Sequence, residues 1–321
     1  MEKKKGLLTL KGLRKLTKHP PLPKVVTVEP STRCNLWCPL CLKGAGLLGA
    51  DRWDKVMPLE KFAALWKEVG QGCEIAVLVG QGEPFLNPDL CDMIAQCGGV
   101  YTIVDTNGNV PLDYAAVVKS GLSELRFSID GLNQEQYERY RVGGNWRLAM
   151  ENMSRLAIFR RAVGALIPHI IWKAIAFAHT ERDMMAWGTL ARRFGADLLH
   201  ASPASTIPQF GKEKWDIFRP KEEGWQRIEK IDFKKGRVFP IVDRKHCPVP
   251  LDNVYISVNG DVSPCCAIDP DDLNFGNVFE EPFKEIWWSA DYVEFRQMVL
   301  EDRHQCDACK ACSYPIPEVA A

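Results

Sequence analysis

The sequence lacks an excess of charge of either sign, a long hydrophobic run and an internal repeat. Lys and Arg together number 41, as do Asp and Glu, so the formal net charge is zero. A chain without net positive charge has no general attraction for nucleic acid. No apolar run approaches the ~20 residues that span a bilayer, and the short apolar stretch at 7–10 is not followed by the cleavage site of a secretory leader. We therefore expect a cytoplasmic protein with no nucleic-acid partner and no stable membrane insertion.

Cysteine, by contrast, is abundant. The chain has 12 cysteines, and without a secretory leader this number indicates metal or redox chemistry rather than a disulfide framework. Cys91 and Cys97 lie in an apolar helical pattern and are predicted to pack in the core. Apart from these two and Cys73, the cysteines fall into two zones, which are Cys34, Cys38 and Cys41 near the start and Cys247, Cys265, Cys266, Cys306, Cys309 and Cys312 near the end.

Short apolar strands alternate with helical patterns between residues 24 and 202. Continuous apolar strands separated by helices indicate a parallel sheet that is covered by helices. Six such units predict an α/β fold, a partial TIM-like (β/α)6 barrel, with functional residues at the carboxyl ends of its strands. The predicted strands cover 24–28, 75–79, 101–104, 125–129, 169–177 and 198–199, and the predicted helices cover 59–69, 88–96, 114–119, 146–163 and 182–194.

Two segments outside the barrel have their own patterns. Residues 1–23 are basic and amphipathic, which predicts an N-terminal helix lying on the domain, with a membrane or partner contact as the alternative. Residues 203–246 are aromatic-rich and are predicted to form a linker with a helix around 221–231. Its Trp215 and Trp225 either line a substrate entry or attach the linker to the barrel.

The last part of the chain is predicted to be a small cysteine-rich α+β module over 247–316. Residues 253–263 have the pattern of a β-hairpin, with a tight turn at Asn259-Gly260. Residues 283–300 have the pattern of an amphipathic helix rich in Trp and Phe. A short tail follows at 317–321.

Three cysteines stand on the loop directly after the first predicted strand. Cys34, Cys38 and Cys41 are separated by three and then two residues. Three thiolates can hold three irons of a [4Fe–4S] cluster and leave the fourth iron open to an added ligand. Zinc is the alternative, but structural zinc takes four protein ligands, and no His or fourth Cys lies near this loop.

This loop resembles the CxxxCxxC hallmark of radical S-adenosylmethionine (SAM) enzymes, which follows the first strand of a six-unit βα barrel. Gln81-Gly82-Glu83-Pro84 resembles the family's GGEP motif, and Thr106-Asn107-Gly108 and Ser128-Ile129-Asp130 resemble motifs at later strand ends. The resemblance covers about residues 24–202 and implies that Glu83 engages the methionyl ammonium. The sequence departs from the family in having Gln81 for Gly, and Leu40 where an aromatic residue usually helps to hold adenine. The positions implied in SAM binding are Leu40, Gln81, Gly82, Glu83, Pro84, Thr106, Asn107, Ser128, Asp130 and Lys173.

The C-terminal cysteines resemble the SPASM and twitch modules that bind auxiliary [4Fe–4S] clusters in radical SAM enzymes. The spacing from Cys247 through Gly260 to Cys265 matches the opening of these modules. The remaining cysteines are too few for two clusters, so the resemblance implies one auxiliary [4Fe–4S] cluster, with a zinc ribbon as the alternative. Its four ligands are expected among Cys247, Cys265, Cys306, Cys309 and Cys312.

Cys266 is left over beside Cys265. It is either a spare thiol or a candidate hydrogen donor, because an S–H bond is weak enough to give a hydrogen atom to a carbon radical. Successive side chains on a strand point to opposite faces, so only one of the two cysteines is expected to face the auxiliary cluster.

The resemblance implies a radical SAM oxidoreductase or epimerase. Such an enzyme cleaves SAM reductively to a 5′-deoxyadenosyl radical, which abstracts a hydrogen from an unactivated C–H bond. The barrel begins at residue 24 without a fused peptide-recognition domain, which favours a small molecule such as a sugar or aminocyclitol, with peptide or protein maturation as the alternative. A flavodoxin- or ferredoxin-type protein is the expected electron donor. A non-catalytic Fe–S electron carrier and a zinc-binding interaction protein remain as other classes.

Overall fold

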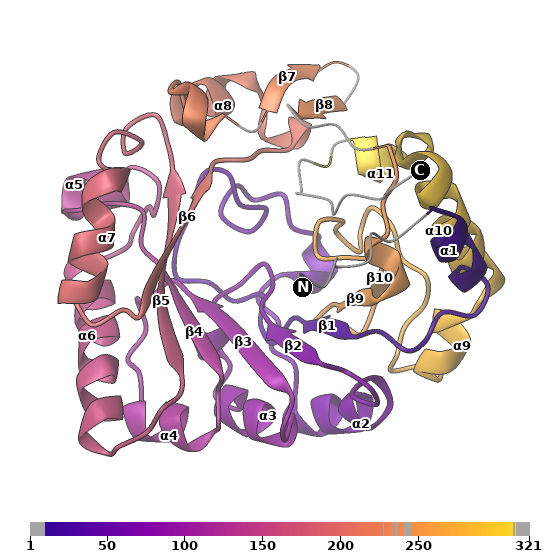
Figure 1. The fold of residues 1–321 in the computed structure, drawn as a ribbon, viewed down its shortest axis with the longest axis horizontal. Helices are drawn as coiled ribbons and strands as arrows, with labels where there is room; N and C mark the ends of the chain where they lie inside the picture. Colours follow the sequence, from indigo (N-terminus) through magenta and orange to yellow (C-terminus); the bar gives the residue numbers. More distant parts are fainter. Residues whose placement is uncertain are drawn as a thin grey trace, which may run out of the picture.

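One curved sheet with helices on its outer side forms the barrel (Figure 1). The computed structural model describes residues 10–226, 228–232, 234, 237–240, 245–310 and 312. The six parallel barrel strands are β1 (Val25–Val28), β2 (Ile75–Leu78), β3 (Tyr101–Thr106), β4 (Glu124–Ser128), β5 (His169–Ala176) and β6 (Leu198–Pro203). Their helices are α2 (Leu59–Val69), α3 (Leu90–Gln96), α4 (Tyr114–Lys119), α5 (Gln134–Glu138), α6 (Trp146–Ala162) and α7 (Met184–Arg193).

The local sequence explains these elements. In α2, Phe62, Leu65 and Val69 recur with helical spacing, and all three are buried. The side chains of Asp113 and Asn145 accept main-chain N–H groups at the starts of α4 and α6, which satisfies donors that have no partner inside the helix. The predicted α/β barrel is therefore confirmed, with α5 as an additional short helix that the sequence does not predict.

The C-terminal hairpin extends the barrel sheet rather than standing beside it. Strand β9 (Asn253–Ile256) pairs in parallel with β1, and β10 (Val262–Ser263) pairs antiparallel with β9. The Ser257 carbonyl accepts the N–H of Gly260, whose φ is 94°. Asn259 is not left-handed, so the turn is a longer one closed by glycine and not the predicted tight Asn-Gly turn.

Two predicted helices differ in the structure. The helix predicted around 221–231 is wrong, because strand β7 (Ile228–Asp232) pairs there with β8 (Arg237–Pro240). Their pairing is a tertiary contact that overrides local helical propensity. The helix predicted over 283–300 is divided into α9 (Phe283–Trp287) and α10 (Ala290–Asp302), since the Ser289 side chain accepts the N–H of Tyr292 and starts a new helix.

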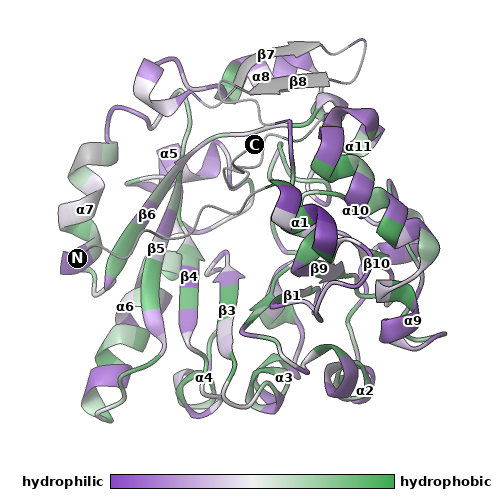
Figure 2. Ribbon diagram, turned by 45° about the vertical axis from the view of Figure 1, so that its right-hand side comes forward, coloured by the Kyte–Doolittle hydropathy of each residue, from purple (hydrophilic) through white to green (hydrophobic). Residues whose placement is uncertain are grey.

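Short helices complete the described chain. Helix α1 (Leu10–Leu16) packs Leu13 against Leu251 and Leu300, and both ribbon views place α1 beside α10 (Figures 1 and 2). Helix α8 (Lys212–Phe218) was not predicted, and α11 (Asp307–Lys310) lies near the described end. Within the described residues, no helix is both long and apolar enough to cross a membrane.

Candidate active site

The three N-terminal cysteines lie beside a cavity at the carboxyl ends of the barrel strands. Cys34, Cys38 and Cys41 line this inner cavity of about 270 Å³. The Cys41 N–H donates to the Cys38 carbonyl at 3.2 Å, so the loop turns back on itself. Gly44 permits this, because a Cβ there would lie 2.5 Å from the Cys38 nitrogen and oxygen. The predicted SAM residues that share the cavity are Gln81, Gly82, Glu83, Thr106, Asn107, Ser128 and Lys173.

Three predicted SAM residues do not line the inner cavity. Leu40 lines a neighbouring outer cavity. Pro84 is buried in a short 3-10 helix, Pro84–Leu86, behind the site. Asp130 is fully buried, pairs with Arg141 and accepts the Ile175 N–H, and both of these partners line the inner cavity.

The donor set fits an iron–sulfur cluster. All three thiols are free of disulfide bonds. Asn107 Nδ2 and Arg141 Nη1 lie 3.9 Å from the sulfurs of Cys34 and Cys38, where N–H groups favour thiolate. Burial raises the pKa of Cys38 to about 12, so its thiolate form needs a positive partner such as iron. No described group of three or more His, Cys, Asp or Glu is gathered closely enough for one metal ion, whereas a four-iron cluster takes each thiolate on a separate iron.

Glu83 is a buried carboxylate that the fold holds in one orientation. Its oxygens accept Thr106 Oγ1 and the Asn107 N–H, both at 2.7 Å, and the Phe85 N–H at 3.2 Å. Burial raises its pKa to about 7, although these hydrogen bonds lower it. A cationic ligand group beside Glu83 would favour the charged carboxylate. Gly82 next to it has no room for a side chain, since a Cβ would lie 2.5 Å from the Ser31 and Arg33 carbonyls.

Replacement of Glu83 with Ala is expected to weaken SAM binding about ten- to a hundredfold. The reason is the loss of a charge-assisted hydrogen bond worth roughly 1.5–3 kcal/mol. Equilibrium binding of SAM to the anaerobically reconstituted protein measures this, with iron content as the check that the cluster remains. Glu83→Gln, which keeps the shape, should also bind weakly, and Glu60→Ala on the exposed face of α2 should bind normally. Unchanged affinity in Glu83→Ala would show that this carboxylate does not contact SAM.

Sequence reasoning missed Arg141 and Asp105. Arg141 lines the inner cavity, and its Nε lies 2.6 Å from Asp130 Oδ2. Asp105 pairs with Lys173, so the lysine predicted to contact SAM already has a carboxylate partner. Arg141 lies in a loop without a strand or helix pattern, and only the fold brings it to Cys38.

A buried ion network joins the inner cavity to the C-terminal module. Arg52 and Glu29 have no exposed side-chain surface, and Arg52 Nη2 lies 3.0 Å from Glu29 Oε2. The other arm of Arg52 pairs with Asp269, close to Cys265 and Cys266 in the chain. Glu29 also accepts the Gln81 N–H at 2.8 Å and the Val258 N–H at 3.1 Å. The end of β1, the Gln81 loop and the module are therefore fixed to one carboxylate.

The five predicted auxiliary ligands form a second thiol cluster. Burial, together with the charge of Cys312, raises the pKa of Cys247 to about 11. The pKa of Cys309 is raised by its hydrogen bond to Cys306, by burial and by the charges of Cys265 and Cys247. Cys247, Cys265, Cys306 and Cys309 also pack against the same hydrophobic core. This grouping is what ligands of one auxiliary cluster require.

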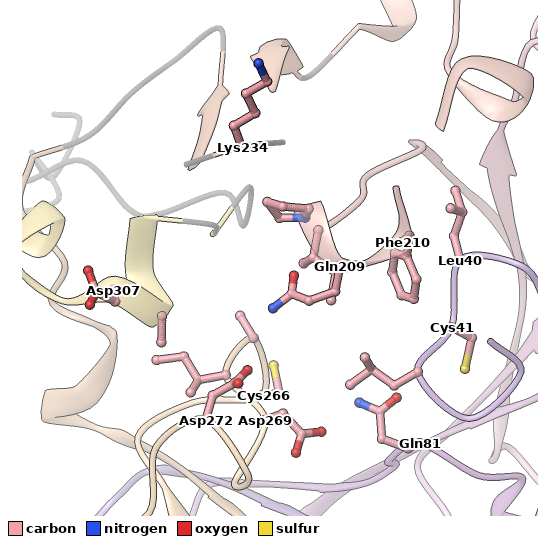
Figure 3. A pocket seen from close by; sticks show the side chains of 16 residues that line it. Leu40, Cys41, Gln81, Gln209, Phe210, Lys234, Cys266, Asp269, Asp272 and Asp307 are labelled. Carbon is pink, nitrogen blue, oxygen red and sulfur yellow. The ribbon is translucent and has the colours of Figure 1, made fainter. Parts of the chain in front are cut away.

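Burial raises the pKa of Cys266 and the charge of Cys312 raises it too, so Cys266 lies near these thiols as well. It lines an outer cavity of about 730 Å³, and its sulfur is directed into that space (Figure 3). Cys265 and Cys266 follow β10 in a turn rather than on the strand itself, and of the two only Cys266 lines the outer cavity. The outer cavity shares Cys41 and Gln81 with the inner one, so the two spaces meet there. Trp215 is buried against the loop of Cys38 and lines neither cavity.

Comparisons with known proteins agree with this geometry. Residues 28–164 match the radical SAM superfamily, and residues 247–313 match the SPASM iron–sulfur cluster-binding domain. The antilisterial bacteriocin subtilosin biosynthesis protein AlbA of Bacillus subtilis (strain 168) is 21% identical over 313 residues, which are 88% of this chain but only 65% of AlbA. A probable GTP 3′,8-cyclase of Methanococcus maripaludis (strain C5 / ATCC BAA-1333) is 30% identical over 255 residues, 74% of this chain and 83% of that protein.

A solved structure shows the same fold. SuiB of Streptococcus suis, bound to S-adenosylmethionine, superposes with a TM-score of 0.67 at 16% identity, over 93% of this chain and 74% of SuiB. The sequence matches indicate the same family as the barrel fold and the two groups of cysteines. The chain therefore belongs to the radical SAM superfamily, with a C-terminal SPASM domain, and its cofactors are a [4Fe–4S] cluster, SAM and an auxiliary iron–sulfur cluster.

Proposed function

We propose that this radical SAM enzyme abstracts a hydrogen atom from an organic substrate held in the outer cavity, and that oxidation or epimerisation completes the reaction. The observation that carries the proposal is the junction of the two cavities at Cys41 and Gln81. A ligand in the inner cavity and a substrate in the outer one would meet at this junction. Reacting atoms must come within about 3–3.5 Å for such a transfer.

The residues of the inner cavity have distinct roles in this proposal. Cys34, Cys38 and Cys41 hold the cluster, Glu83 accepts hydrogen bonds from the SAM ammonium, and Arg141 binds its carboxylate. When bound, the cluster and SAM supply a 5′-deoxyadenosyl radical, and the auxiliary cluster supplies an electron acceptor. Leu40 and the walls of the outer cavity limit the access of water to this junction.

Reconstituted protein is expected to hold close to eight irons per chain, because the two thiol groups each fit a four-iron cluster. Iron and zinc are measured together by elemental analysis after anaerobic reconstitution. About four irons per chain, with zinc in the C-terminal domain, would contradict the proposal that this domain binds an auxiliary iron–sulfur cluster. A flavodoxin- or ferredoxin-type protein is proposed as the physiological reductant.

Cys266 is proposed to give the hydrogen atom that an epimerisation returns to the substrate, since its thiol opens toward the outer cavity. The thiyl radical left on its sulfur would take one electron from the flavodoxin- or ferredoxin-type reductant and one proton from water, which restores the thiol. Cys266→Ala is expected to keep 5′-deoxyadenosine formation and to lose the epimerised product. Wild type in deuterated water should place deuterium on the product carbon, as mass spectrometry would show. Full turnover by Cys266→Ala would exclude this donor and leave oxidation as the outcome.

Two substrate classes fit the proposal. The first candidate is a small molecule such as a sugar or aminocyclitol. A peptide is the second candidate, because AlbA acts in bacteriocin biosynthesis and SuiB has been solved with its precursor peptide SuiA.

A further inference from the structure

A buried arginine in α10 keeps one N–H group without a regular partner. Arg296 has no exposed surface, and its guanidinium lies 4.0 and 3.8 Å from the ring centroids of Trp287 and Tyr292. Its Nε donates to the Pro250 carbonyl at 2.9 Å, and its Nη1 donates to the Trp287 carbonyl at 2.7 Å. Nη2 makes no hydrogen bond of ordinary geometry in the part of the chain that the structure describes.

None of these partners carries the negative charge that a buried guanidinium requires. Burial lowers the pKa of Arg296 to about 10, and no carboxylate is among the groups that raise it. Arg52, which is also fully buried, instead has the carboxylates of Glu29 and Asp269 as partners. A buried charge without a counter-charge is strongly unfavourable. Arg296 therefore stands where a negatively charged group is expected once the domain holds its cluster.

The ring of Tyr292 connects this arginine to the auxiliary thiols. Tyr292 is fully buried, stacked on Phe275 at a centroid distance of 4.2 Å, and its hydroxyl makes no hydrogen bond of ordinary geometry to a described residue. Burial raises the pKa of this hydroxyl, the charge of Arg296 lowers it, and the charge of Cys265 raises it. Cys265 also packs against the core that contains Tyr292. The hydroxyl thus lies near both the guanidinium and the thiol.

These two groups are of the kinds that tune an iron–sulfur cluster. The reduction potential of such a cluster depends on the charge around it, on hydrogen bonds to its sulfurs and on its exposure to solvent. The reduced form carries one more negative charge than the oxidised form. A nearby cation and an O–H donor therefore both favour the reduced form.

We propose that Arg296 and the hydroxyl of Tyr292 raise the reduction potential of the auxiliary cluster on the side of Cys265. The Tyr292 oxygen accepts from Arg296 Nη2, and its O–H donates to the Cys265 sulfur. Arg296 acts through its charge and through Tyr292, so it is a positioning residue. This inference takes Cys265 as a ligand of the auxiliary cluster. It extends the proposed function, because a higher potential makes that cluster a better acceptor for the electron that an oxidation removes from the substrate.

Potentiometric titration followed by electron paramagnetic resonance tests the inference on the anaerobically reconstituted protein. The signal that SAM changes belongs to the N-terminal cluster, whose fourth iron is open, so the other signal reports on the auxiliary cluster. The variants are Arg296→Met and Tyr292→Phe, the second of which keeps the aromatic ring. Lys284→Met on α9 is the matched control, because it removes an exposed cation whose charge water and salt already screen.

In Arg296→Met, the ratio of reduced to oxidised auxiliary cluster at a fixed potential should fall at least about tenfold, which is about 59 mV in midpoint potential. Tyr292→Phe should lower this ratio about fivefold, the loss of one hydrogen bond. Lys284→Met should match wild type, and the N-terminal cluster should keep its potential in all variants.

A wild-type auxiliary potential in either Arg296→Met or Tyr292→Phe, or an equal shift in Lys284→Met, would overturn the inference. If Arg296→Met binds only the N-terminal cluster, Tyr292→Phe decides by the same criterion. Only about four irons in wild type would contradict the auxiliary cluster and this inference together. Formation of 5′-deoxyadenosine is measured separately, and its absence would count against the proposed function alone.

Discussion

The variant in which Cys34, Cys38 and Cys41 are all replaced with Ala is expected to form no 5′-deoxyadenosine. These thiols are the only described cysteines that line the inner cavity, so without them no iron stands beside Glu83 and Arg141. The auxiliary cluster would remain, and iron should fall from close to eight to about four per chain. Chromatography of the reaction with SAM and dithionite measures the loss, with circular dichroism as the check of folding.

Two further variants make this experiment specific. Cys306→Ala with Cys309→Ala should keep some uncoupled SAM cleavage, because those thiols are proposed as ligands of the auxiliary cluster and do not line the inner cavity. Cys73→Ala with Cys91→Ala removes cysteines outside both zones and should behave as wild type. Loss of all SAM cleavage in a folded Cys306/Cys309 variant would show that the N-terminal thiols alone are not sufficient for SAM cleavage.

Replacement of Arg52 with Met is expected to lower the free energy of unfolding by about 3–5 kcal/mol, the usual effect of removing one partner from a buried ion pair. Glu29 and Asp269 would lose the positive charge that they share. The side chains of Arg52 and Glu29 are fully buried, so water could not replace that charge. Glu29 also accepts the main-chain N–H groups of Gln81 and Val258. The Gln81 loop and the C-terminal domain should therefore both lose stability. Denaturant unfolding of the reduced apoprotein measures the change.

An exposed ion pair provides the control for Arg52. The side chain of Arg182 is 86% exposed and pairs with Glu222 at 3.1 Å. Arg182→Met should therefore change stability by less than about 1 kcal/mol, as exposed pairs do. Arg52→Lys should recover only part of the loss, because one ammonium cannot serve both carboxylates as the forked guanidinium does. An Arg52→Met protein as stable as Arg182→Met would contradict the network.

The sequence predicts the site best where a motif ends a barrel strand. Glu83, Asn107 and Ser128 each follow an apolar strand, and the parallel topology alone brings their strand ends together. Cys34 and its neighbours were placed by the same reasoning, and the inner cavity gathers them. The position of these residues at the cavity can be predicted because strand periodicity and local spacing are visible in the sequence.

Contacts between distant segments carry no local signal. Arg52 and Asp269 are 217 positions apart, and β1 meets β9 across a similar separation in sequence. The pairing of β7 with β8 likewise makes a strand of a segment whose local pattern resembles a helix. Arg141 reaches Cys38 only through the barrel, and the outer cavity is lined by several separate loops. Such features depend on tertiary packing, which outweighs intrinsic propensity.

The most direct test of the account is reductive cleavage of SAM by the wild-type protein. Anaerobically reconstituted enzyme is mixed with SAM and dithionite, and 5′-deoxyadenosine is quantified by chromatography with mass spectrometry. The account predicts that 5′-deoxyadenosine and methionine form in equal amounts, and that neither forms without reductant. Intact SAM after reduction of a protein that holds close to eight irons would contradict it.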